Sequence, residues 1–143
     1  MTFTASLLDP AKRPQVVAAI AKVLDEEVSS KSGLSGIALK GAYASAKKAK
    51  EGIVDKGANA MLPDVAAALQ PYWEGKGDQS FAAHLTQHKS AVADALLKVV
   101  DDKAANPDNA TLAKIYKPIR GKAKGYVEEA LPKLGAALEP FVN

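Results

Sequence analysis

Apolar residues recur at steps of three and four residues along most of the chain. The pattern is clearest within residues 16–28, 81–99 and 115–138. This spacing places the apolar side chains on one face of an α-helix, and the abundant alanine favours helices further. No segment alternates apolar and polar residues as a strand would, and the hairpin dipeptides Asn-Gly and Asp-Gly do not occur. The pattern predicts an all-α protein, a bundle of about six or seven helices.

Clusters of glycine, serine and asparagine interrupt the helical pattern. Residues 29–33, 74–78 and 106–109 are predicted loops because such residues favour turns. The pair Asp9-Pro10 predicts a helix start, with the aspartate as N-cap and the proline at the first helical position.

Five further prolines mark points where helices start, end or bend. Pro63 and Pro132 suit the first turn of a helix, where proline loses no backbone hydrogen bond. Pro71 and Pro140 follow in the same two segments and are expected to end or bend those helices. Pro118 falls inside another helical pattern, and we expect it to kink or split that helix.

The second half of the chain repeats features of the first. Residues 62–73 and 131–142 are identical at six of twelve positions, including both prolines. Two more pairs of segments match in the same order, 16–28 with 92–104 and 39–55 with 112–128. These matches predict two tandem three-helix pseudo-repeats.

One repeat of about 55–60 residues would bury only a marginal core, so we expect the two copies to pack face to face. The predicted domain is single, 1–143, with pseudo-repeats at approximately 14–75 and 90–143. Residues 1–13 and 79–91 are expected to extend the first helix of each copy backwards. The alternative is convergent use of alanine-rich amphipathic helices.

Composition narrows the possible chemistry. The chain has 143 residues, of which 48% are hydrophobic and 24% charged, as in an ordinary folded domain. It has no cysteine, which excludes disulfides, thiol catalysis and thiolate metal sites. No apolar window is long enough to span a membrane, and the first residues lack the pattern of a secretory signal. We therefore expect a cytoplasmic protein.

Basic residues cluster without acids in the middle helix of each predicted copy. They are Lys40, Lys47, Lys48 and Lys50 in the first copy, and Lys114, Lys117, Arg120, Lys122 and Lys124 in the second. Two related basic surfaces could meet phosphates or another polyanion. The alternative is a solvated helix face, because Glu51, Asp55, Glu128 and Glu129 follow closely and can pair with the lysines.

No catalytic constellation accompanies this charge pattern. Gly121 and Gly125 lack the strand-then-helix context of a phosphate-binding loop, so we expect them to permit close helix packing. His84 and His88 have the spacing that can hold one metal ion, but no third ligand suggests itself. Acidic residues end the first helix of both copies, where pairing with lysines is the expected role. We predict no catalytic residue, metal site or cofactor.

Three segments carry a resemblance to a known family: residues 7–14, 27–36 and 120–132. Over most of its length the chain resembles a family of short, uncharacterised proteins from actinomycete bacteria. The resemblance implies a bacterial cytosolic protein and transfers no activity, cofactor or site.

The function expected from these observations is that of a non-catalytic helical interaction or scaffold protein. Its partner would be a polyanion, met through the duplicated basic helices, or another protein. The alternative is a carrier of a small apolar ligand bound between the two repeats, because helical bundles can enclose such sites. A metal-dependent enzyme using His84 and His88 is a third and weaker hypothesis.

Overall fold

The computed structural model describes residues 2–31, 33–49, 52–107 and 110–142. These residues form helices and contain no strand, so the all-α prediction is confirmed. The helices are α1 (Phe3–Leu8), α2 (Arg13–Ser30), α3 (Gly33–Ala49), α4 (Ile53–Glu74), α5 (Phe81–Gln87), α6 (Lys89–Ala104), α7 (Ala110–Tyr116) and α8 (Arg120–Leu138). Short 3-10 turns, η2 (Lys117–Ile119) and η3 (Glu139–Phe141), flank α8.

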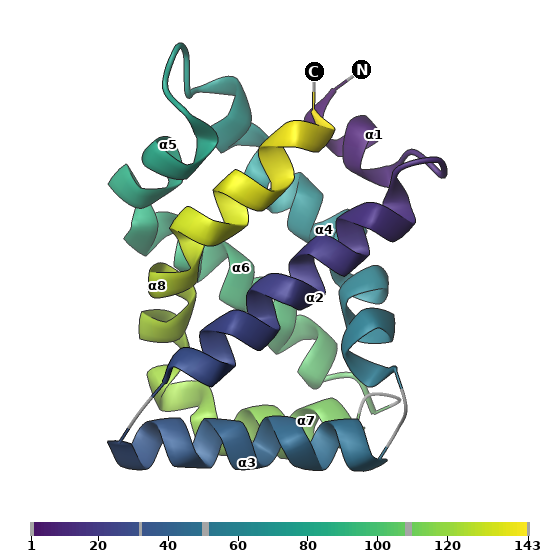
Figure 1. Cartoon of the computed structure of the whole chain (residues 1–143), viewed down its shortest axis with the longest axis vertical. Helices are drawn as coiled ribbons and strands as arrows, with labels where there is room; N and C mark the ends of the chain where they lie inside the picture. Colours follow the sequence, from purple (N-terminus) through teal and green to yellow (C-terminus); the bar gives the residue numbers. More distant parts are fainter. Residues whose placement is uncertain (1, 32, 50–51, 108–109, 143) are drawn as a thin grey trace.

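Four helices, α2, α4, α6 and α8, run along the molecule and form its body (Figure 1). Both α4 and α8 contact α2, and both also contact α6. Helices α3 and α7 cross one end, whereas α1, α5 and the two chain termini lie toward the other (Figure 1). No helix in the part of the chain that the structure describes is long and apolar enough to cross a membrane.

Helix contacts follow the same order in the two halves of the chain. Helix α1 contacts α2 and α4 as α5 contacts α6 and α8. In the same way, α2 contacts α3 and α4 while α6 contacts α7 and α8. Between the halves, α2 packs on α8, α4 on α6, and α3 on α7.

The core draws on both halves. Fully buried side chains include three pairs that occupy matching places in the aligned segments: Val16 with Val92, Leu62 with Leu131, and Leu69 with Leu138. Each such side chain contributes about 1.5–3 kcal/mol when it is removed from water. All six belong to one hydrophobic cluster, so the halves share a core.

Residues 1–13 and 79–91 do not extend α2 and α6 as continuous helices. Helix α2 begins at Arg13 rather than Pro10, after a turn in which Asp9 Oδ1 accepts the Ala11 N–H at 3.0 Å. In the second half α5 ends at Gln87 and α6 starts at Lys89.

Capping and aromatic packing explain why α1 and α5 are separate helices. Thr2 and Ser80 cap them, because their hydroxyls accept the N–H groups of Ala5 and Ala83 at 3.1 Å. The turn after each helix lets Phe3 and Phe81 enter the core, where their ring centroids lie 5.3 Å apart.

The prolines fall partly where expected. Pro118 lies in η2 and separates α7 from α8, as predicted. Pro63 and Pro132 lie inside α4 and α8 rather than in a first turn, because both helices begin well before them. At Pro63 the carbonyl that loses its helical donor is that of Asn59, and Arg13 Nη2 donates to it at 2.9 Å. Pro71 sits in the last turns of α4, which ends three residues later.

Candidate anion-binding surface

The basic segments of the two halves lie at the same end of the molecule. Helix α3 contacts both α7 and η2, and α3 and α7 cross this end together (Figure 1). Residues 33–49 and 110–127, which we call the basic end, hold eight of the nineteen basic residues and none of the sixteen acidic ones. The rest of the chain is therefore net acidic, and two of its acids, Asp25 and Asp101, lie against the basic segments.

Helix α3 turns one face to solvent at the basic end. Ile37, Gly41, Ala44 and Lys48 recur at steps of three and four residues, and all four are exposed. Lys40 is exposed on the flank of this stripe. The side chain of Ile37 is 68% exposed, although it stands in the middle of a helix.

A second stripe continues the basic end along α7, η2 and the start of α8. Ala110, Lys114, Lys117 and Gly121 recur at the same spacing, and all are exposed. They occupy the positions that align with Ile37, Gly41, Ala44 and Lys48 in the first half. Both halves therefore expose the corresponding helix face, and each adds lysines to it.

Eight of the nine predicted basic residues lie in the described part of the chain and divide into two groups. Lys47 Nζ lies 3.6 Å from Asp25, Arg120 Nε 2.9 Å from Asp101, and Lys124 Nζ 3.1 Å from Asp94. Lys50 lies outside the described residues. The other five are exposed and form no ion pair with a described residue: Lys40, Lys48, Lys114, Lys117 and Lys122. These five are the charges left to meet an external anion.

A matching trio of side chains ties each basic segment to the body. In the second half, the Tyr116 hydroxyl donates to Asp101 Oδ1 at 2.6 Å, and Arg120 bridges both carboxylate oxygens at 2.9 and 3.1 Å. The hydrogen bonds from Arg120, and then Tyr116, lower the pKa of Asp101. Burial and the bond to Asp101 raise the pKa of Tyr116.

The first half builds the same trio from the aligned residues. The Tyr43 hydroxyl donates to Asp25, and Lys47 pairs with the same carboxylate. Each cation also lies over its tyrosine ring, Lys47 at 5.3 Å and Arg120 at 6.0 Å from the centroid. The alignment of the two halves matched these tyrosines and aspartates, but it did not predict that they form trios. The signal that could have identified the trios is the recurrence of the same residues in both halves.

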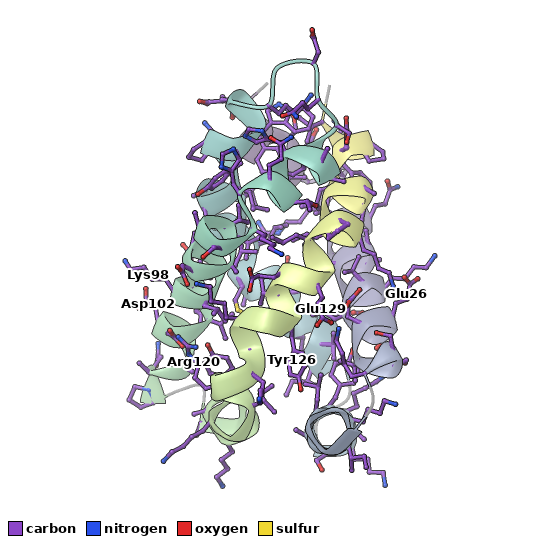
Figure 2. All side chains as sticks on the ribbon, turned by 90° about the vertical axis from the view of Figure 1, so that its left-hand side faces the viewer. Glu26, Lys98, Asp102, Arg120, Tyr126 and Glu129 are labelled. Atoms are coloured by element: carbon purple, nitrogen blue, oxygen red, sulfur yellow. The ribbon has the colours of Figure 1, made fainter. Side chains whose placement is uncertain are left out.

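The acids that follow the second basic segment are partly engaged elsewhere. Glu129 lies between α8 and α2, with Tyr126 nearer the basic end (Figure 2). Its carboxylate pairs with Lys31, which also binds Glu27 at 3.1 Å. Burial lowers the pKa of Lys31, but the hydrogen bonds to Glu129 and Glu27 outweigh this and raise it overall. Glu129 therefore neutralises an interhelical lysine rather than the basic end.

The two histidines lie at the opposite end of the molecule, on and after α5. His84 is only 9% exposed, and its Nδ1 lies 3.1 Å from Gln79 Oε1, whereas His88 is exposed. Their ring centroids are 4.6 Å apart. Within the described ranges no group of three or more histidine, aspartate or glutamate side chains could hold a metal ion.

Two hollows in the described surface are open to solvent and partly charged. One, of about 320 Å³, is lined by Asp25, Lys47 and Asp55 together with small and apolar residues. The other, of about 360 Å³, lies between α4 and α6 beside Asp64, Lys98 and Asp102. A site for a small apolar ligand is typically a concave, mostly apolar cavity that encloses the ligand. These two hollows do not have that character.

Comparison with known proteins gives one result for almost the whole chain. A family model described as a family of unknown function, DUF6918, matches residues 3–142. No curated protein and no solved structure matches the chain. The match to the family model covers every helix described above, and the chain accordingly belongs to this family.

Proposed function

We propose that this chain is a non-catalytic helical interaction protein whose basic end binds an anionic partner. The observation that carries the proposal is the gathering of five exposed lysines, without described ion-pair partners, on two neighbouring segments, residues 33–49 and 110–127, that contain no acidic residue. Lysines that neutralise phosphates or sulfates release bound counterions, which gives affinity without a specific pocket. An open surface suffices for such binding.

The distribution of charge supports an oriented encounter. The basic end is strongly positive, while the remainder carries more acidic than basic residues. A polarised protein aligns in the field of an anionic surface before contact and reaches it faster than a uniformly charged one. The net charge is only +3, because the excess of basic residues in the basic end is largely cancelled by the excess of acidic residues in the rest of the chain.

We infer that the two halves are copies of one unit, which doubles the basic segment at one end. The matching helix contacts and the two trios support this inference. So does a pair of ion pairs with reversed charge: Asp64 meets Lys103 at 3.4 Å, and the aligned residues Lys133 and Glu27 meet at 3.4 Å. A pseudo-two-fold arrangement brings aligned positions to equivalent places.

Two other expectations remain proposals. A carrier of a small apolar ligand finds no support in the open, charged hollows, so we place it second. A cytoplasmic location rests on the sequence pattern and the resemblance, and an actinomycete origin rests on the resemblance.

Binding to heparin, duplex DNA and RNA at about 50 mM and about 200 mM salt tests the proposal. The K40Q/K114Q/K117Q variant removes three basic-end lysines. A matched control, K22Q/K89Q/K98Q, removes three exposed lysines from α2 and α6 and changes net charge equally. We expect the first variant to bind at least about tenfold more weakly than the control, with a salt dependence reduced by about one unit per lysine.

Two outcomes contradict the proposal. One is that the wild-type protein binds none of these polyanions at about 50 mM salt. The other is that the two triple variants lose affinity equally, because net charge rather than the basic end would then decide binding.

A further inference from the structure

Ile37 is the least expected side chain at the basic end. It is 68% exposed, and the one other exposed large hydrophobic residue among the described residues is Leu24 of α2, at 41%. On the α3 face its neighbours are Lys40, Gly41 and Ala44. An apolar side chain thus projects above a floor of small residues with lysines beside it.

Because several residues on this face of α3 are small, few side chains project from its backbone. Gly41 has open space around its Cα, because a Cβ added there would meet nothing within 4 Å. Gly33 and Ala44 are also exposed on the same side. A flat partner could therefore approach the α3 backbone closely. The side chain of Ile37 would then extend past the surface of this partner into its interior.

The orientation of the helices suits a flat partner as well. Helices α3 and α7 lie across the end of the molecule rather than pointing out of it (Figure 1). Exposed lysines lie along both: Lys40 and Lys48 on α3, Lys114 on α7 and Lys117 in the adjoining η2. The basic end thus carries exposed lysines along two neighbouring helices.

The side chains favour a lipid surface over a nucleic acid. Arg120 is the single arginine of the basic end, and its guanidinium is already bound to Asp101. Tyr43 and Tyr116 are half-buried and hold their aspartates, so neither offers a free ring for base stacking. Contacts between lysines and phosphates alone would leave Ile37 in water.

We propose that the basic end docks on the surface of an anionic phospholipid bilayer, with Ile37 inserted at the boundary between headgroups and acyl chains. Lys40, Lys48, Lys114 and Lys117 would lie among the headgroup phosphates. Interfacial helices bind in this way through buried apolar area together with attraction to anionic lipids. The rest of the chain carries more acidic than basic residues, so it is attracted less to such a surface. This inference rests on the proposed function.

Co-sedimentation of the full chain with vesicles tests the proposal. We expect binding to phosphatidylcholine vesicles that contain phosphatidylglycerol and none to phosphatidylcholine alone. Replacing one basic-end lysine, as in K114Q, should weaken binding about fivefold. I37S should weaken it about tenfold through the lost apolar burial.

The matched control is L24S, which removes the other exposed hydrophobic side chain, on α2 rather than on α3 or α7. It should bind the anionic vesicles as the wild type does. I37S should also bind heparin unchanged, because the lysines remain in place. Both replaced residues are exposed, and thermal unfolding of each variant verifies that the fold is kept.

The outcomes separate this inference from the function on which it rests. If the protein binds heparin but not anionic vesicles, or if I37S binds vesicles as wild type does, lipid docking is wrong and polyanion binding stands. Tighter binding to duplex DNA than to vesicles, unaffected by I37S, would assign a nucleic acid instead. Binding to neither heparin nor vesicles would overturn both proposals.

Discussion

Gly135 sets how closely α8 approaches α5. A Cβ added there would lie 2.6 Å from Ala82 Cα and 2.7 Å from Ala82 N, so backbone meets backbone. The sequence suggested Gly121 and Gly125 for close packing, and that prediction is wrong, because a Cβ at either would meet nothing within 4 Å. A local sequence pattern shows where glycines occur. It does not show which of these glycines a neighbouring helix will pack against.

This contrast predicts opposite effects of two similar substitutions in α8. Gly135→Ala should lower the free energy of unfolding by about 1–3 kcal/mol, because the backbones must move apart. Gly125→Ala should raise it by about 0.5–1 kcal/mol, because alanine loses less backbone entropy in an exposed helix. Urea denaturation measures both. A stabilised Gly135→Ala variant would contradict the close crossing.

The Asp101 trio predicts a pH-dependent contribution to stability. Because Arg120, and then Tyr116, hold the pKa of Asp101 below its usual value of 3.8, its carboxylate stabilises the folded state. That stability is complete above the ordinary pKa and disappears as pH falls through the lowered folded-state pKa. Tyr116→Phe and Asp101→Asn should each cost about 1 kcal/mol at pH 7.

Urea denaturation of these variants at pH 7 and near pH 2 provides the measurement. The difference between the wild type and Asp101→Asn should shrink at the lower pH. A difference that stayed constant with pH would show that the ionised carboxylate does not stabilise the fold.

At the scale of elements, the sequence predicted most helices and the loop after α4 but misplaced several ends. Of the other two predicted loops, Ser29, Ser30 and Gly33 belong to α2 and α3, and residues 32 and 108–109 lie outside the described residues. Helical periodicity identifies buried faces, and Pro118 marked a true break. The separation of α1 and α5 from the following helices was missed, because it depends on the burial of Phe3 and Phe81 against each other. The position of Pro63 inside α4 depends on Arg13, a distant residue that binds the freed Asn59 carbonyl.

The docking of α5 predicts a second pH effect. Burial, and then the nearby charges of His88 and Lys76, lower the pKa of His84 below 6.5. The unfolded chain therefore takes up a proton first, and the free energy of unfolding should decrease as pH falls below about 6.5. The loss continues down to the folded-state pKa, with a slope of at most about 1.4 kcal/mol per pH unit.

Stability measured between pH 7 and pH 5 in His84→Leu and His88→Gln tests the assignment to His84. The first variant should lose the dependence, because the buried titrating group is gone. The second should keep most of it, because His88 is exposed. Equal slopes in the wild type and His84→Leu would assign the effect to other groups.

At the scale of the whole molecule, the sequence identified the lysines but not their common location. Whether two helices present one face depends on how the halves pack, which no local pattern encodes. Nor could the sequence separate free lysines from bound ones. Lys124 lies 3.1 Å from Asp94, and Lys133 binds α2, through contacts between residues far apart in the chain. The candidate surface is therefore a tertiary property.

The central claim is that α3 and α7 share one end of the molecule. Because the chain has no cysteine, two introduced cysteines carry the only spin labels. Double electron–electron resonance measures the distance between the two labels. This distance should be shorter for the exposed pair Ala44→Cys and Lys117→Cys than for the pair Ala44→Cys and Asp78→Cys. The second pair reaches the loop after α4 at the opposite end (Figure 1), and should span about 30 Å or more. Equal distances, or a longer one for the first pair, would contradict the shared basic end.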